Sequence, residues 1–423
     1  MSLTNPNNLV TEKRLSEFYK KIYPYLGARI PPIVYGMRIL RDESVPSSKV
    51  IYLEDAIDMT PVSMNLSTGA FDYGSWGNAF FMPKPCMLKY DGTVDYYLDP
   101  NDYTKKADGT ASDVADTEYE GNAMMEWPKI WLKIVPDESK NNQEADIFIA
   151  NQQVDDDYYD WAYHNSLSES KEHFYTAIYN PSLVDNKYRS ISGLSCVHNL
   201  TFNQDISYAN ANNPSTDVIW SALDISAVQL INFLIVLISK STNSQAVFGS
   251  GAVWSNMNAF NSGTKNDKGL FYGTSSNNDP VKIFGMENWY GYRCKRLLGD
   301  IIINGEIKRK LTYGPEDGTN ITGYNTTGEN YLSTGATVID AGWQHGKYAL
   351  FNQCGLTPAV AGGTATTYYC DYFKFTVSAS VKPLRFGDGY DFGDASGIFC
   401  YHYGSGFGDY SAGIACGLMA HPI

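Results

Sequence analysis

The stretch LRFGDGYDFGDASGIFCYHYGSGFGDYSAGIACGL, residues 384–418, decides the fold expected for this chain. Aromatic side chains alternate there with Gly, Ser and Asp, and residues 385–418 contain no Lys, Glu, Gln, Trp or Met. This mixture supplies rigid contact area together with small, adaptable hydrogen-bonding groups, as antibody paratopes do. The composition predicts a compact aromatic binding surface, and it also fits the glycine-rich edge of an antiparallel sheet. The aromatic residues are Tyr390, Phe392, Tyr401, Tyr403, Phe407 and Tyr410.

The overall composition is that of an ordered globular protein. Its 423 residues are enough for two or three average domains or for one large β-rich domain. Charged residues account for only 18% of the chain and aromatic residues for 14%, which is not the composition of a disordered protein. The net charge is −14 and no basic stripe is present, so we expect no nucleic-acid partner.

Neither the N-terminus nor the most apolar segment predicts a signal peptide or a membrane span. Residues 1–8 lack both a charged n-region and an apolar core. Residues 228–238 are shorter than the roughly twenty apolar residues needed to cross a bilayer, and they predict a buried helix. No C-x-x-C pair is present, and we expect all seven cysteines to be reduced and structural. They are Cys86, Cys196, Cys294, Cys354, Cys370, Cys400 and Cys416.

Hydrophobic periodicity predicts a short N-terminal helix, one main helix and many short strands. The short amphipathic helix is expected over residues 11–26, where its apolar stripe needs another copy, an attachment protein or its own domain to cover it. The main helix follows Ser221 or Asp224, and its apolar face over residues 225–238 is wide enough to lie on a sheet. The expected architecture is α+β, dominated by strands. Alternating runs predict strands at residues 33–40, 49–52, 79–82, 96–98 and 130–135.

The residues with reactive side chains do not form a catalytic motif. Cys400 and His402 share one side of an expected strand, but no third group orients them. Asp388, Asp391 and Asp394 lie in one Gly-rich loop, where acidic residues usually cap turns. No zinc spacing is present, and the acidic turns do not match the calcium-loop pattern. We therefore predict no catalytic residue, no metal and no cofactor.

Five sequence pieces resemble, in order, the C-type-lectin-fold proteins of bacteriophage tails, including those diversified by a retroelement. They are NAMMEWPKIW at 122–131, NSQ at 243–245, GMENWYG at 285–291, YYCDY at 368–372, and LRFG at 384–387 followed by Gly393, Gly397 and Phe399. Formylglycine-generating enzymes have a similar fold. The resemblance spans about residues 120–418. It implies an α+β, C-type-lectin-like fold whose C-terminal segment forms a ligand-binding face.

In diversified members of this family, the randomised codons cannot become Lys, Glu, Gln, Trp or Met, and residues 385–418 follow that rule. The chain lacks the Glu-Pro-Asn, Gln-Pro-Asp and Trp-Asn-Asp motifs with which sugar-binding relatives hold calcium, so calcium-dependent sugar binding is not expected. The ligand contacts implied by the resemblance are Gly389, Tyr390, Asp391, Phe392, Asp394, Ser396, Tyr401, His402, Tyr403, Ser405 and Asp409.

Residues 8–19 resemble the opening of phage tail fibre proteins, where such a segment anchors the fibre. We therefore expect a helical attachment or oligomerisation segment at 1–30, a β-rich region at 31–119 and a C-type-lectin-like ligand-binding domain at 120–423. The β-rich region is either separate or part of that same domain. The expected function is a non-enzymatic, trimeric phage tail adhesin. It would sit in the virion, contact a tail or baseplate protein, and bind a protein or glycan receptor on the bacterial surface. The alternatives are a thiol oxidase-like enzyme or polysaccharide depolymerase of the same fold, and a prophage-encoded or bacterial surface-displayed binding protein.

Overall fold

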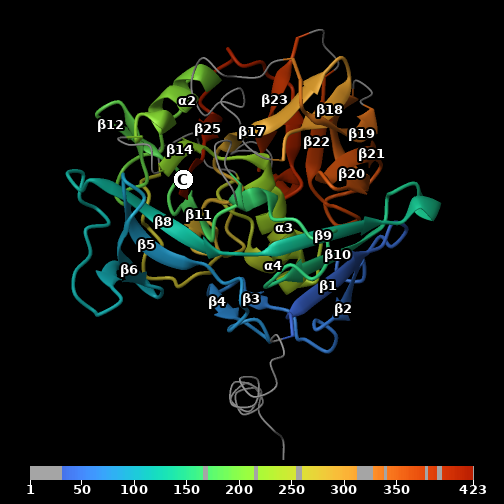
Figure 1. Cartoon of the computed structure of the whole chain (residues 1–423), viewed down its shortest axis with the longest axis horizontal. Coiled ribbons are helices and arrows are strands. Elements are labelled where there is room, and N and C mark those ends of the chain that lie inside the picture. Colours follow the sequence, from blue (N-terminus) through green and yellow to red (C-terminus); the bar gives the residue numbers. More distant parts are fainter. Residues whose placement is uncertain are drawn as a thin grey trace, which may run out of the picture.

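The chain is mostly β. The computed structural model describes residues 31–164, 170–213, 218–253, 260–311, 327–337, 341–376, 380–387 and 393–422, and the predicted helix over residues 11–26 lies outside them. Strands make up 40% of the structure and helices 11%. The expectation of an α+β, C-type-lectin-like fold with one main helix was therefore wrong. Figure 1 shows several sheets arranged around the central helix α3.

An antiparallel four-stranded sheet, in the order β2-β1-β10-β9, opens the described chain. It confirms the strands predicted at residues 33–40, 49–52 and 130–135. The run at residues 79–82 was wrongly predicted as a strand, because backbone hydrogen bonds from Ala79 and Met82 close turns there. The four strands are β1 Val34–Ile39, β2 Val50–Glu54, β9 Trp131–Pro136 and β10 Ala145–Ala150.

A seven-stranded sheet, in the order β14-β26-β11-β8-β5-β6-β7, spans the predicted boundary at residue 120. β5 Lys84–Lys89 pairs directly with β8 Gly121–Pro128, so strands from both sides of the boundary share one sheet. One continuous hydrophobic core also runs from Met37 to Ala420. The other strands are β6 Val94–Asp99, β7 Asp102–Lys106, β11 His173–Ala177, β14 Val218–Ala222 and β26 Leu418–Pro422.

The C-terminal part forms a nine-stranded sheet that nearly closes into a barrel. Its order is β19-β18-β17-β23-β24-β22-β20-β21, and β25 pairs with β17 off this path. β19, at one end of this order, contacts β20 and β21 at the other end. There Asn352 Nδ2 on β20 donates to the Ser333 carbonyl on β19 at 3.4 Å. The strands are β17 Cys294–Ile303, β18 Glu306–Arg309, β19 Leu332–Thr337, β20 Ala341–Asn352, β21 Gly355–Ala361, β22 Tyr372–Phe375, β23 Lys382–Phe386, β24 Tyr401–Tyr403 and β25 Ile414–Cys416.

The main predicted helix is confirmed as α3 Ile225–Ser239, and the Asp224 carboxylate caps it by accepting from the backbone N–H of Ala227 at 2.6 Å. All its residues are buried, because sheets surround it on more than one side. Two further helices were missed. α2 Phe202–Asn210 begins with a capping box between Thr201 and Gln204, and α4 Ser244–Phe248 begins at Asn243.

Short elements complete the described chain. They are the hairpins β3 Ser63–Asn65 with β4 Ala70–Asp72, β12 Ser182–Val184 with β13 Lys187–Arg189, and β15 Lys282–Ile283 with β16 Met286–Glu287, and the 3-10 turns η1 Glu138–Lys140, η2 Trp161–Tyr163 and η3 Gly393–Ala395. All seven cysteines are buried and unbridged, as predicted. In the part of the chain that the structure describes, no helix is long and apolar enough to span a membrane.

Candidate ligand-binding face

Strand β24 has one side inside the barrel and one side outside it. It lies between β22 and β23, and successive side chains of a strand point to opposite faces. Tyr401 and Tyr403 point into the barrel, where their exposed fractions are 1% and 0%. His402 lies on the outer side. The two tyrosines, which the sequence predicted as ligand contacts, are therefore part of the interior in this structure.

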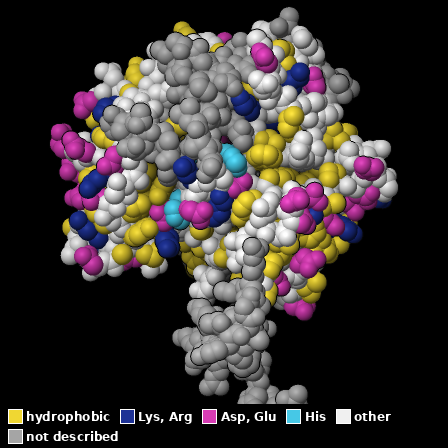
Figure 2. All heavy atoms as spheres, viewed as in Figure 1, with side chains coloured by type: hydrophobic (Ala, Val, Ile, Leu, Met, Phe, Trp, Pro, Cys, Tyr) yellow, Lys and Arg dark blue, Asp and Glu magenta, His cyan; other side chains and the backbone are white. Residues whose placement is uncertain are grey.

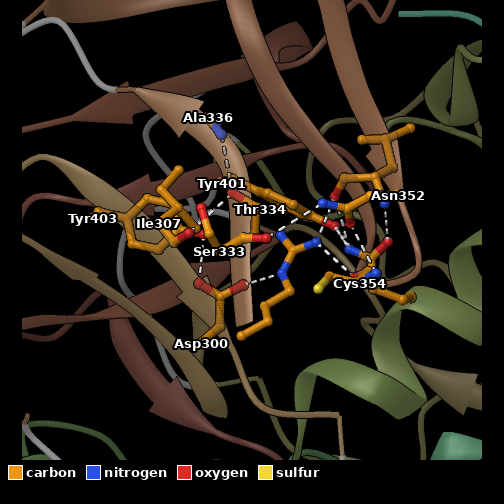
Figure 3. Close-up of polar contacts among 12 residues, drawn as sticks. Asp300, Ile307, Ser333, Thr334, Ala336, Asn352, Cys354, Tyr401 and Tyr403 are labelled. Atoms are coloured by element: carbon orange, nitrogen blue, oxygen red, sulfur yellow. Dashed lines mark hydrogen bonds and ion pairs between the residues drawn. The ribbon is translucent and has the colours of Figure 1, made fainter. Parts of the chain in front are cut away.

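The barrel interior contains an ion pair between Asp300 and Arg309, both with 0% side-chain exposure (Figure 3). The Tyr403 hydroxyl donates to the second carboxylate oxygen of Asp300 at 2.6 Å. Arg309 Nη1 donates to the carbonyl oxygens of Cys354 and Leu356 at 3.1 and 2.9 Å. Charges removed from water need such partners, so this network requires Tyr403 at its present position.

Helix α3 joins the network through Gln229. Its Nε2 donates to the Tyr401 hydroxyl at 2.5 Å, and its Oε1 accepts from the Leu356 backbone N–H at 2.8 Å. Burial raises the pKa of Tyr401 to about 12, so its hydroxyl remains protonated at neutral pH. The inner side of β24 is thus fixed to helix α3 through Tyr401 and to β17 across the barrel through Tyr403, and it provides a rigid support for the outer side.

The outer side of the same strands carries a group of aromatic and basic side chains, which we call the cationic-aromatic face. It consists of Trp343 on β20, Tyr372 and Lys374 on β22, Arg385 on β23 and His402 on β24. The strand register places Lys374 and Arg385 on either side of His402. The Trp343 ring centroid lies 4.5 Å from that of His402 and 6.2 Å from that of Tyr372. The Lys374 ammonium lies 5.4 Å from the Trp343 centroid.

His402 is neutral in this environment. Burial lowers its pKa to about 2, and the nearby cations Arg385, Lys374 and Lys382 act in the same direction. Its ring therefore accepts from Arg385 Nη2, which contacts both ring nitrogens, Nδ1 more closely than Nε2 at 2.9 Å. An uncharged imidazole next to a guanidinium orients the cation without neutralising it.

The turn before β24 is built around a buried carboxylate. Asp371 accepts from the Phe399 backbone N–H at 2.7 Å, and a Cβ added to Gly397 would lie 2.3 Å from an Asp371 oxygen. Only glycine fits there without displacing the carboxylate. Of the two predicted contacts in this turn, Ser396 is buried and Asp394 is exposed.

After β24 the chain forms an exposed loop, residues 404–413. Gly404 packs against the imidazole of His402, because an added Cβ would lie 2.1 Å from its Nε2. The Asp409 carboxylate accepts from the Gly406 backbone N–H at 2.8 Å. Tyr410 is 67% exposed, the highest value among the large hydrophobic side chains that the structure describes. The loop thus continues the cationic-aromatic face and presents an aromatic ring to solvent.

A buried ion pair anchors this loop. Arg296 pairs with Asp205, each with a 1% exposed side chain, and the same guanidinium bonds to the carbonyl of Asp409. The loop also lies on α2, where the rings of Phe202 and Phe407 stack with centroids 6.2 Å apart. The exposed residues 408–411 therefore project from a fixed backbone.

The structure places the predicted contacts in three groups. Gly389, Tyr390, Asp391 and Phe392 lie outside the described residues. Ser396, Tyr401, His402 and Tyr403 are buried, Ser405 is half-buried, and Asp394 and Asp409 are exposed. Sequence reasoning did not single out Trp343, Lys374 or Tyr410 as candidate contacts. The available signals were Tyr372 in the piece YYCDY and the i, i+2 spacing of Tyr372 and Lys374, which places both on one side of a strand.

The thiols do not have the environment of nucleophiles. Burial raises the pKa of Cys196 and Cys354 to about 11, and it raises that of Cys416 well above its usual value. Cys400 lies in the turn before β24, where its backbone N–H donates to the Gly397 carbonyl at 3.2 Å, whereas His402 lies on the strand itself. No group of three or more His, Cys, Asp or Glu side chains able to hold a metal occurs among the described residues.

A polar cluster near η2 contains residue types that hydrolases use. The Asp160 carboxylate bonds to His164 Nε2 at 2.8 Å, to Lys129 Nζ at 2.8 Å and to the Ser170 hydroxyl. A lysine that activates a serine must lose its proton, whereas Lys129 is paired with a carboxylate. The hydrogen bonds from these three partners also lower the pKa of Asp160 despite its burial. The cluster is therefore organised as an ion pair.

Figure 2 shows Asp and Glu side chains both at the edges and near the middle of this face, with Lys and Arg scattered among them. Comparison with protein-family models gave no match, and neither did comparison with curated proteins.

Proposed function

We propose that this chain is a non-enzymatic adhesin of a bacteriophage tail that binds a receptor on the bacterial surface. The observation that carries the proposal is the loop at residues 404–413, which presents the exposed ring of Tyr410 from a backbone held by the buried pair Asp205–Arg296. Binding residues concentrate on loops supported by rigid scaffolds, and exposed tyrosines are common interface anchors. The resemblance of residues 8–19 and 384–418 to phage tail proteins supplies the biological setting.

The proposal includes an assembly and a place in the virion. Residues 1–30 would attach the chain to a tail or baseplate protein, and three copies would form the functional unit. Several linked copies raise avidity without any new contact, which suits weak single sites on a cell surface. Diversification of the C-terminal segment by a retroelement fits the composition of residues 385–418.

Binding of the purified full chain to cells of the host strain tests this function. We expect saturable binding, and we expect Tyr410→Ala to weaken it about tenfold, because truncated aromatic anchors typically cost more than 1 kcal/mol. Ile57→Ala is the matched control, since Ile57 is 58% exposed and lies in the turn after β2. Absence of saturable binding would contradict the adhesin. Release of saccharide fragments or oxidation of a host thiol by the folded chain would support the enzyme instead.

A further inference from the structure

The four-stranded sheet β2-β1-β10-β9, at the lower right of Figure 1, is apolar on both of its sides. Its inner side belongs to the hydrophobic core, where Met37, Ile39, Val50, Ile147 and Ile149 are almost completely buried. An antiparallel sheet that faces water on its outer side normally alternates apolar and polar side chains. This sheet departs from that pattern, because the strand register places mainly apolar side chains on the outer side as well. A sheet that is apolar on both sides needs a second covering layer.

We call the outer side of β1, β2, β9 and β10 the sheet face. Two of its side chains, Ile51 on β2 and Val135 on β9, are each 43% exposed. Between them, a Cβ added to Gly36 would lie 2.8 Å from Leu53 and 3.1 Å from Phe148. Glycine inside a strand often marks a place where another backbone approaches closely, and here it leaves the middle of the face without a projecting side chain. The apolar members of the sheet face are Val34, Ile51, Leu53, Trp131, Val135 and Phe148.

The surroundings of the sheet face are acidic. Residues 33–58 and 131–157, which contain the four strands, carry twelve Asp and Glu against five Lys and Arg. A groove of about 240 Å³ at one end of the face is lined by Val135, Asp137 and Glu144, among others. Complementary charge at the rim of an interface steers association and selects the partner. A partner for this face therefore combines an apolar stripe with basic side chains.

Residues 11–26 of this chain have both properties. Their sequence predicts an amphipathic helix, whose apolar stripe consists of Leu15, Phe18, Ile22 and Leu26. Residues 11–30 carry five Lys and Arg against two Glu. A helix of this extent would be about 24 Å long, and four strands of five or six residues cover an area about 20 Å long and about 15 Å wide. The stripe and the sheet face therefore match in size and are opposite in charge.

The residues that connect this segment to the sheet favour a partner in another copy. Pro31 and Pro32 restrict their own backbone and that of the residue before each of them to extended conformations. The Ile33 backbone N–H donates to Asn151 Oδ1 at 3.0 Å, so the chain continues the line of β1 there. A return of the segment over its own sheet would require a reversal within residues 27–30. An extended approach instead carries the segment away from its own sheet.

We propose that residues 11–26 of one copy of this chain bind the sheet face of a second copy. The apolar stripe covers the outer side of the sheet, and the basic side chains of the segment lie beside the acidic surroundings. The inference rests on the assembly of several copies in the proposed function, and it names the surface that joins them. It is independent of the receptor.

Light scattering of the purified full chain measures this association. We expect a mass that is a multiple of the 47.0 kDa of a single chain, and weaker association as salt rises. Val135→Lys and Phe18→Lys place a charge on either side of the apolar contact, and each should weaken association at least about tenfold. Val360→Lys is the matched control, because Val360 is an exposed valine on β21 in another sheet. Circular dichroism checks that each variant is folded.

Chemical crosslinking identifies the two surfaces. All seven native cysteines are buried, so an added surface cysteine supplies the reactive thiol in the folded chain. Two differently tagged copies, one with Ile22→Cys and one with Ile51→Cys, are coexpressed and treated with a short bismaleimide. We expect a covalent heterodimer. The same experiment with Val360→Cys in place of Ile51→Cys should give none.

A monomeric unmodified chain, or an assembly that withstands both Val135→Lys and Phe18→Lys, would overturn the inference. Crosslinking only when both new cysteines are in one chain would show that the segment covers its own sheet, which also overturns it. Saturable binding to host cells by a monomeric chain would refute the contact between copies and leave the adhesin standing. An assembled, crosslinked chain without saturable binding to host cells would refute the adhesin and leave the contact standing.

Discussion

The inner and outer sides of β24 differ in whether the arginine on that side pairs with a carboxylate. On the inner side, the Tyr403 hydroxyl, Asp300 and Arg309 form a buried, hydrogen-bonded ion pair. On the outer side, Arg385 contacts the neutral ring of His402, and no described carboxylate pairs with it. Each of the two arginines keeps one buried donor without a partner, Arg309 Nη2 and Arg385 Nε. Tyr401 and Tyr403 therefore belong to the scaffold, and His402 between them belongs to the outer side. Aromatic content alone does not tell a contact residue from a support residue.

The largest expected loss of stability comes from breaking the ion pair between Asp300 and Arg309. Arg309→Met leaves Asp300 buried without its partner, and such changes cost about 3–5 kcal/mol. Urea denaturation of the full chain measures this loss. The matched change on the outer side, Arg385→Met, should cost clearly less because no carboxylate depends on Arg385 in the described structure. A loss below about 1 kcal/mol for Arg309→Met would show that the barrel interior is not closed as described.

The second effect concerns one hydroxyl group on the inner side. Tyr403→Phe removes the donor to Asp300 and should destabilise the fold by about 1–3 kcal/mol, because an acceptor in the interior loses its partner. Tyr410→Phe changes an exposed ring and should leave the free energy of unfolding within about 0.5 kcal/mol. Equal stability of the two variants in denaturation curves would remove the distinction between scaffold and surface tyrosines.

Acid should destabilise the fold through His402. Its pKa is lowered in the native state to about 2, so below its unfolded value of about 6.5 the unfolded chain binds a proton that the native chain does not. The stability supplied by the neutral ring is full above pH 6.5 and falls by up to about 1.4 kcal/mol per pH unit below it. Urea denaturation at pH 7, 6 and 5 should show a smaller slope for His402→Gln than for the unmodified chain. Identical slopes would mean that His402 is charged in the native state.

The smallest effect on stability is expected on the outer side. Lys374 is half-buried and takes part in no carboxylate pair that the structure describes, so Lys374→Gln should change the free energy of unfolding by no more than about 0.5 kcal/mol. The same variant is expected to weaken binding to host cells. Thermal denaturation and cell binding of one preparation check both statements. A large loss of stability would place Lys374 in the scaffold.

The sequence predicted local features well. The apolar run at residues 225–238 and the cap at Asp224 identify α3, and the alternation of residues 33–40 identifies β1. The capping box at Thr201 and Gln204 was present in the sequence and was overlooked. The overall class was missed because the barrel depends on pairings between distant segments, such as β17 with β23, that no local pattern specifies.

The candidate site could be predicted only in part. The exposed Asp394 and Asp409 lie in the predicted segment, whereas Trp343 and Lys374 lie on β20 and β22, which precede it in the sequence. The sequence also could not show whether Tyr401 and Tyr403 point into the interior or outward. All three residues of β24 are aromatic, so the alternation along the strand does not reveal which side is buried. The buried pair of Asp300 and Arg309, far away in the sequence, decides which side faces inward.

We propose that the outer side of β24 binds the receptor and that the inner side stabilises the fold. Affinity for host cells and melting temperature, measured together on Trp343→Ala and Tyr403→Phe, test it most directly. The account predicts that Trp343→Ala loses about tenfold in affinity and remains folded, while Tyr403→Phe melts at a lower temperature and binds with unchanged affinity when kept folded. Lost binding in folded Tyr403→Phe with full binding in Trp343→Ala would contradict it.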